Sequence, residues 1–252
     1  MAKLKEISRS SRGAKPEETI AKNDELLKDK PTGEALQEIL YYKSMAYNRK
    51  GDKTTAKKLL EEAQDDSTLV ALHDQERAGI DIVSDGEVRR ESYFNRFANA
   101  LEGIDVDNPA IVPGRTGKPT LVPRVVGPIR RKEPVQVRDV AYLRAHTEKP
   151  IKVTIPGAFT MAKMAADEHY GDQEALIMAY ATAVNEEIHE MKDAGATVIQ
   201  IDEPHMQAHP IESNRFGVAA IDLSLIHISE PTRRYAISYA VISIKKKRGG
   251  GG

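Results

Sequence analysis

The sequence has no cysteine and no tryptophan, and aromatic residues make up only 5% of its 252 residues. Without cysteine, the chain can form no disulfide bond and can offer no thiolate to a metal ion. It has no apolar run long enough to cross a bilayer, and its basic N-terminus lacks the apolar core of a secretory signal. The formal net charge of -1 gives no indication of nucleic-acid or membrane binding. These absences predict a cytoplasmic protein that binds neither nucleic acid nor membranes.

The N-terminal part is predicted to be helical after a short tail. Residues 1–15 are rich in Lys, Arg and Ser, a composition typical of a disordered basic tail. Residues 16–62 carry apolar residues at helical spacing on both sides of a Gly-Asp turn, which predicts a helical hairpin. The spacing of Tyr47, Gly51 and Ala56 resembles one tetratricopeptide repeat. Because a single repeat needs neighbours to bury its faces, an ordinary helical hairpin stays the alternative interpretation.

Three short apolar runs have the character of buried strands. One lies within residues 195–204, which start at a glycine suited to a helix cap and stop at two carboxylates and a proline. Another, Ile80–Val83, also follows a helix end and a glycine, and the third is 151–155. A long amphipathic helix is predicted at 173–193. Alternating strands and helices indicate a parallel sheet whose polar loops gather at one edge.

The segments between these runs carry weaker signals. Residues 65–67, Asp-Asp-Ser, are predicted to cap the start of a new helix. Residues 105–123 are rich in Pro, Gly and Asn and are predicted to form a long loop. A strand at 124–129 and a helix at 135–146 are expected to follow this loop.

Polar residues follow each of the three predicted strands. A pair of acidic residues at the carboxyl end of a buried parallel strand is where α/β folds place their chemistry. The residues that follow the predicted strands include Asp85, Glu87, Pro156, Gly157, Asp202 and Glu203. The alternative for Asp85 and Glu203 is that these two carboxylates only cap helices or orient loops.

Together, the three motifs resemble the catalytic C-terminal half of the cobalamin-independent methionine synthase family. The motifs are Gly79 to Glu87, Val153 to Gly157 and Ile199 to Pro204, and the resemblance runs from about residue 60 to 221. It is closest to short single-barrel members, the 5-methyltetrahydropteroyltriglutamate–homocysteine methyltransferases. The resemblance implies an α/β fold, a partial (β/α)8 TIM-type barrel with about half the strands, at residues 63–221 and preceded by the helical hairpin.

The resemblance also implies a function. The family moves a methyl group from 5-methyltetrahydrofolate to a zinc-bound homocysteine thiolate. The metal lowers the pKa of the thiol, and carboxylates hold the ammonium group so that the sulfur is aimed. By this resemblance Glu87 and Asp202 would bind the homocysteine amine, and the other candidates would line the same pocket mouth. Homocysteine and methyl-folate are the small-molecule partners that it implies.

The chain departs from the family pattern in three places. The family's zinc ligands include two cysteines, one in a His-x-Cys motif, and this chain has none. It also lacks the family's first barrel strand. Residues 222–252 include a run, Leu223 to Tyr235, that resembles translated sequencing-adapter sequence, which predicts a non-native, disordered tail. The run His227-Ile228-Ser229 follows Asp202 too closely to match the family motif, and serine is a poor zinc ligand.

These departures predict that the chain is a catalytically inactive fragment. About half a barrel leaves strand edges unpaired, which favours self-association through those edges. Two alternatives stay open. The first is another barrel enzyme of the same superfamily, of the uroporphyrinogen decarboxylase or coenzyme M methyltransferase type. The second is a helical-repeat interaction protein with a binding groove on residues 35–63.

Overall fold

The computed structural model describes residues 14–226 and 228, apart from 33, 91–94 and 114–118. The chain divides into two compact units, Met1–Arg89 and Arg90–Gly252. Nearly all of the predicted basic tail and most of the predicted C-terminal tail, including His227, lie outside the described residues. Among the helices that are described, none combines the length and apolar character needed to span a bilayer.

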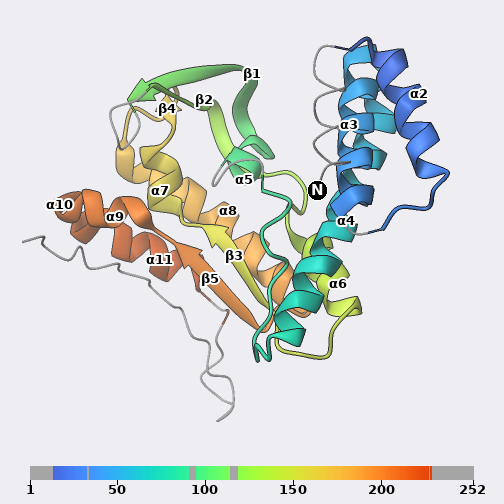
Figure 1. The fold of residues 1–252 in the computed structure, drawn as a ribbon. Coiled ribbons are helices and arrows are strands. Elements are labelled where there is room, and N and C mark those ends of the chain that lie inside the picture. The colour runs from blue at the N-terminus through green and yellow to red at the C-terminus, as the bar shows by residue number, and fades with distance from the viewer. Residues whose placement is uncertain (1–13, 33, 91–94, 114–118, 227, 229–252) are drawn as a thin grey trace, which may run out of the picture. The chain divides into compact units, whose positions relative to one another are not determined.

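The first unit is built from three helices, α2 (Pro16–Leu27), α3 (Glu34–Lys50) and α4 (Lys53–Arg77) (Figure 1). The predicted hairpin is formed by α3 and α4, and α2 packs against α3. The turn between α3 and α4 follows from its residues. Gly51 has a φ of +89°, and the Asp52 carboxylate caps α4 by accepting a hydrogen bond from the Thr55 N–H at 3.0 Å.

Helix α4 is longer than the sequence pattern predicts. The predicted cap at 65–67 is wrong, because α4 runs through it without a break. The Ser67 and Thr68 hydroxyls instead donate to carbonyl groups four residues earlier, at 2.8 and 2.9 Å, as they do inside a helix. The domain division placed between 62 and 63 therefore falls inside α4.

The predicted strand at Ile80–Val83 is also wrong, since only Val83 forms an isolated bridge. The helix before it ends as expected, with Gly79 at a φ of +76°. The Gln75 side chain then forms two hydrogen bonds with the backbone of Ser84, directly after the predicted strand. Its Nε2 donates to the Ser84 carbonyl at 2.8 Å, and its Oε1 accepts from the Ser84 N–H at 2.9 Å. A side-chain amide from α4 thus bonds the backbone groups that a neighbouring strand would otherwise bond.

The second unit contains a three-stranded sheet in the order β1-β2-β4, a parallel pair β3-β5, and several helices (Figure 1). In chain order its elements are α5 (Asn95–Asn99), β1 (Leu101–Pro113), β2 (Pro119–Arg131), α6 (Val137–Ala145), β3 (Lys152–Pro156), α7 (Ala158–Lys163), β4 (Ala166–Asp167), α8 (Gln173–Asp193), β5 (Val198–Asp202), α9 (Pro204–Ala208), α10 (Pro210–Glu212), a π-helical turn (Ser213–Gly217) and α11 (Val218–Ser224).

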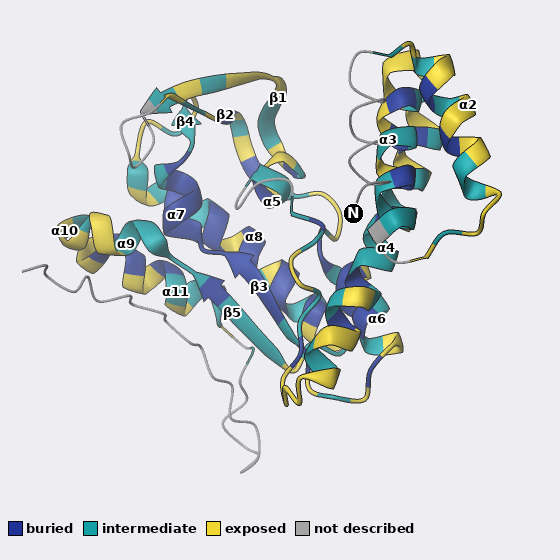
Figure 2. Ribbon diagram, in the orientation of Figure 1, coloured by how far each residue is buried: buried dark blue, intermediate teal, exposed yellow. Residues whose placement is uncertain are grey.

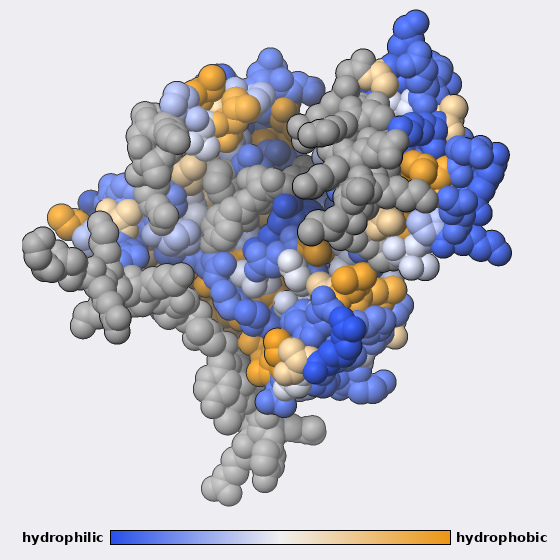
Figure 3. Space-filling model, in the orientation of Figure 1, coloured by the Kyte–Doolittle hydropathy of each residue, from blue (hydrophilic) through white to orange (hydrophobic). Residues whose placement is uncertain are grey.

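The predicted loop at 105–123 is wrong, because most of it belongs to the antiparallel strands β1 and β2. Asn108 and Pro109 are accommodated by a register shift between Asp105 and Ala110. There the Asp105 carboxylate accepts from the Asn108 N–H at 3.1 Å and closes a local turn. Figure 3 shows apolar atoms over this hairpin, where Ile111 and Leu121 pair across the strands and are 68% and 57% exposed.

The parallel pair β3-β5 carries the strands predicted at 151–155 and within 195–204. Lys152 pairs with Val198 and Pro156 with Asp202, in an unbroken register. Helix α8 lies between the two strands in the chain and buries a continuous apolar stripe. Figure 2 shows the buried residues of this unit concentrated on β3, α7 and α8. Two parallel strands with a helical crossover form the repeating unit of a (β/α)8 barrel, so this part of the chain is a partial barrel.

A buried ion pair fixes the connection from β2 to α6 against α8. Glu187 of α8 is fully buried and accepts from Arg131 Nε at 2.7 Å and from the Gln136 N–H at 2.6 Å. The Val135 N–H also donates to this carboxylate, at 3.0 Å. Arg131 binds Glu190 through two further hydrogen bonds of 2.6 and 2.8 Å. One carboxylate thus bonds a charged side chain and two backbone groups.

We expect Glu187→Gln to lower the free energy of unfolding by about 3 kcal/mol, because the change leaves Arg131 without its buried counter-charge. Chemical denaturation of the purified chain measures this value. The control is Glu186→Gln, the same change at an exposed neighbouring position of α8. Equal effects of the two changes would show that the buried pair does not stabilise this connection.

Candidate functional site

The carboxyl ends of β3 and β5 meet at Pro156, Gly157 and Asp202. The Gly157 N–H donates to the Asp202 carbonyl at 2.9 Å, which extends the strand pairing by one bond beyond β3. Pro156 lies opposite Asp202 in the register. Three of the predicted site residues are therefore neighbours at one edge of the parallel pair, where α/β folds place their chemistry.

Glu203, the next residue, caps α7. Its Oε1 accepts from the Phe159 N–H at 2.9 Å, and its Oε2 accepts from the Thr160 N–H at 2.7 Å and from the Thr160 hydroxyl at 2.6 Å. The first turn of a helix leaves such N–H groups without partners inside the helix. This arrangement is the helix-capping alternative that the sequence left open, and a role for Glu203 in lining a pocket stays a prediction.

Gly157 leaves the space that the Glu203 side chain occupies. A Cβ atom at this position would lie 2.2 Å from the Glu203 carboxylate. Any larger residue would have to displace either the carboxylate or the turn. Gly157, directly after β3, thus permits Glu203 of a distant segment to reach the start of α7.

The electrostatic state of Glu203 follows from its burial. Burial raises the pKa of the Glu203 carboxyl above its usual value, and the nearby charge of Asp202 raises it further. The hydrogen bonds from Thr160 and Phe159 act in the opposite direction but do not offset the burial.

Two residues beside Asp202 were missed by the sequence analysis. Gln200 Nε2 donates to Asp202 Oδ1 at 2.7 Å, and Lys152 Nζ donates to Gln200 Oε1 at 3.1 Å. The sequence spacing of Gln200 and Asp202 could have revealed this contact, because residues two apart on a strand share a face. Gln200 and Asp202 therefore had to lie side by side in any strand covering both.

Asp85 and Glu87 belong to the first unit and Asp202 to the second. The Asp85 carboxylate accepts from the Glu87 N–H at 3.0 Å, so it orients its own loop, as the alternative interpretation proposed. Glu87 is exposed and has a φ of +59°, a conformation that few residues other than glycine adopt. That Glu87 and Asp202 bind one ligand stays a prediction.

The donor groups present do not fit the zinc ion that the family resemblance implies. The sequence offers no thiolate. Within the described residues, no cluster of three or more His, Asp or Glu side chains could hold a metal ion. His205 and His209 stack with ring centroids 5.9 Å apart, while Glu212 is held by Lys163 at 2.8 Å.

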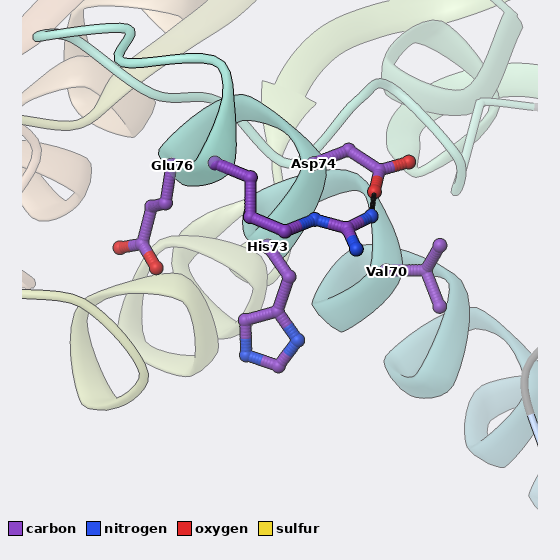
Figure 4. Close-up of a pocket in the computed structure, with 5 residues that line it drawn as sticks. Val70, His73, Asp74 and Glu76 are labelled. Carbon is purple, nitrogen blue, oxygen red and sulfur yellow. Dashed lines mark hydrogen bonds and ion pairs between the residues drawn. The ribbon is translucent and has the colours of Figure 1, made fainter.

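A surface depression lies on α4, and none of the candidate site residues lines it (Figure 4). It is lined by Val70, His73, Asp74, Glu76 and Arg77. All five belong to one helix, and Arg77 and Asp74 form an ion pair across it. The depression is open to solvent and gathers no residue that the sequence predicts to be functional.

The raised pKa of Glu203 predicts a pH dependence of stability. A carboxyl group that holds its proton more tightly when folded makes the folded state lose stability as pH rises. We expect the free energy of unfolding to fall as pH rises above the usual carboxyl pKa of 4.5 towards the raised pKa of Glu203. Glu203→Gln should remove that fall, and denaturation curves between pH 4 and pH 8 measure it.

The matched control is Glu212→Gln. Hydrogen bonding to Lys163 lowers the pKa of Glu212, so this carboxylate contributes stability that is lost on acidification, with the opposite sign. If Glu203→Gln leaves the pH dependence unchanged, the account of Glu203 as a buried cap is wrong.

Comparisons with known proteins agree with this geometry. Residues 42–220 match the family described as "Cobalamin-independent synthase, Catalytic domain". A methionine synthase from Saccharolobus solfataricus is 33% identical over 165 residues, which cover 65% of this chain and 48% of the relative. One from Sulfurisphaera tokodaii is 36% identical over 170 residues, with 66% and 48% covered. The chain thus spans about half the length of the curated relatives it matches.

A solved structure supports the same assignment. It is the B12-independent methionine synthase from Shewanella sp. W3-18-1 in complex with selenomethionine, with a TM-score of 0.64 and 38% identity over 67% of this chain and 49% of that chain. The matched region ends where the sequence resemblance ends, but it starts earlier, inside α3, and so includes all of α4. Because the family match covers more than half of the chain, the protein belongs to the cobalamin-independent methionine synthase family.

Proposed function

We propose that this chain supplies the amino-acid-binding part of a methionine-synthase-type methyltransferase. The observation that carries the proposal is the Asp202 carboxylate at the carboxyl end of β5, beside the Gly157 turn, in a chain of this family. A carboxylate fixed at the end of a buried strand suits an ammonium group, such as that of homocysteine. The Shewanella relative was solved in complex with selenomethionine, also an amino acid, which supports a ligand of this class.

The proposal gives Glu87 the role of second carboxylate for the same ammonium group. Methyl-folate is the proposed methyl donor, and the cytoplasm is the proposed location. Uroporphyrinogen decarboxylase-type and coenzyme M methyltransferase-type activities are not favoured, because the family match and the relatives reported above carry the synthase name. A separate helical-repeat protein is not favoured either, since α4 lies inside the matched region.

The proposed activity of this chain is limited to binding. Zinc activation of the thiol needs ligands that the sequence does not contain, because it has no cysteine. Self-association is part of the proposal as well. Within the described residues β5 has a single strand neighbour, and the exposed Ile111–Leu121 pair adds apolar surface.

Calorimetric titration tests the binding claim. L-homocysteine should bind the chain more tightly than its des-amino analogue, which keeps the thiol and the carboxylate. Asp202→Asn should remove most of that preference, a loss of about 1.5–3 kcal/mol for a hydrogen bond to a charged group. Asp193→Asn, at the exposed end of α8, is the control. A double-mutant cycle with Glu87→Gln should show a coupling energy if both carboxylates bind one ammonium group. Equal affinity for the two ligands would exclude the proposed function.

A second measurement tests the proposal that the chain binds its ligand but does not catalyse methyl transfer. We expect no methyl transfer from 5-methyltetrahydrofolate to homocysteine when the purified chain is supplied with zinc, and no stoichiometric zinc after dialysis, because thiolate ligands are missing. Tight zinc at one ion per chain, together with turnover, would contradict this part of the proposal.

A further inference from the structure

One row of side chains on the parallel pair is mostly polar, although it also holds Pro156 and Val198. Lys152 and Thr154 of β3 share this row with Gln200 and Asp202 of β5, because the register aligns Thr154 with Gln200. The opposite row holds the buried Val153, Ile155 and Ile201. Lys152, Gln200 and Asp202 of this row are half-buried, so their polar groups need partners within the row or from solvent.

Within this row, three side chains form a hydrogen-bonded relay. Lys152 Nζ donates to Gln200 Oε1 at 3.1 Å, across the two strands. Gln200 Nε2 donates to Asp202 Oδ1 at 2.7 Å, along β5. All three residues are half-buried, where such bonds are stronger than they are in water. The diagonal separation between neighbouring strands is within reach of a lysine side chain.

The two ends of the relay fix the orientation of the amide between them. A lysine ammonium group can only donate hydrogen bonds, and an ionised carboxylate can only accept them. Rotating the Gln200 amide by half a turn would place its NH2 against Lys152 and its oxygen against Asp202. Both contacts would then be repulsive, so Lys152 selects the one orientation in which Gln200 donates to Asp202.

We propose that Gln200, oriented by Lys152, is a positioning residue that holds the Asp202 carboxylate in place for the ligand's ammonium group. The proposal rests on the proposed function, because it takes Asp202 as the amine-binding residue. The main chain of Asp202 is fixed separately by the Gly157 N–H, so the relay adds control of the side chain. A binding carboxylate whose rotamer is fixed before the ligand arrives loses less freedom on binding.

The relay acts on one part of the ligand only. It positions the carboxylate that is proposed to bind the ammonium group, and the proposal gives it no contact with the ligand's thiol or carboxylate. Losing it should therefore weaken binding of amine-bearing ligands and leave des-amino ligands unaffected. Damage to the fold would weaken both kinds of ligand alike.

The test compares Lys152→Met and Gln200→Leu with the matched controls Lys132→Met and Gln173→Leu, which lie outside the row. Calorimetry measures the affinity of each variant for L-homocysteine and for its des-amino analogue. We expect both relay variants to bind L-homocysteine about fivefold more weakly and the analogue as tightly as the unchanged protein does. An unchanged ratio of the two affinities in the relay variants would overturn the proposal.

A second readout does not depend on ligand binding. In 1H–15N spectra, the side-chain NH2 of Gln200 should exchange with water faster in Lys152→Met than in Lys132→Met. Equal exchange rates would show that Lys152 does not orient the amide, and the proposal would fail. If the unchanged protein does not distinguish the two ligands, the proposed function fails and the role of Gln200 in ligand binding fails with it. The exchange rates would still show whether Lys152 orients the Gln200 amide, so the two failures can be told apart.

Discussion

The ends of β3 and β5 are held together by two adjacent residues, Asp202 and Glu203. The Asp202 carbonyl accepts the Gly157 N–H, and the Glu203 carboxylate accepts the first N–H groups of α7. Together these bonds tie a strand end, a turn and a helix start to the end of the neighbouring strand. Asp202 is the last residue of β5, and the residue after it is fixed by the cap on α7. The backbone of Asp202 is therefore held on both its N-terminal and its C-terminal side.

In the same region, two consecutive carboxylates have different surroundings. Glu203 uses both carboxylate oxygens within the fold, which suits it to a structural role. Asp202 is half-buried, and its side chain is contacted by a neutral amide. Two consecutive acids thus point to different environments because successive side chains of an extended chain face opposite ways. The second acid therefore caps α7, and the first is the one for which we propose ligand binding.

The elements that could be predicted from the sequence are those marked by a pattern within a short stretch of residues. Helix α8 and strands β3 and β5 were predicted because each has an unbroken apolar pattern with a glycine or proline at its end. The predicted strand at 80–83 was wrong, and the Gln75 side chain, a contact that no sequence pattern reveals, bonds the backbone of Ser84 directly after it. The loop at 105–123 was wrong because register shifts allow a hairpin to contain residues that usually break strands. The capping role of Glu203 depends on a contact between residues 43 positions apart, so the sequence could pose it only as an alternative.

The central claim is that the carboxyl end of the β3-β5 pair binds the ammonium group of an amino acid. Its most direct test is 1H–15N chemical-shift mapping of the purified chain during titration with L-homocysteine. The account predicts the largest backbone shifts at Gly157 and Asp202, with none in α2, and weaker shifts with the des-amino analogue. Shifts confined to other segments, or identical shifts with both ligands, would contradict it.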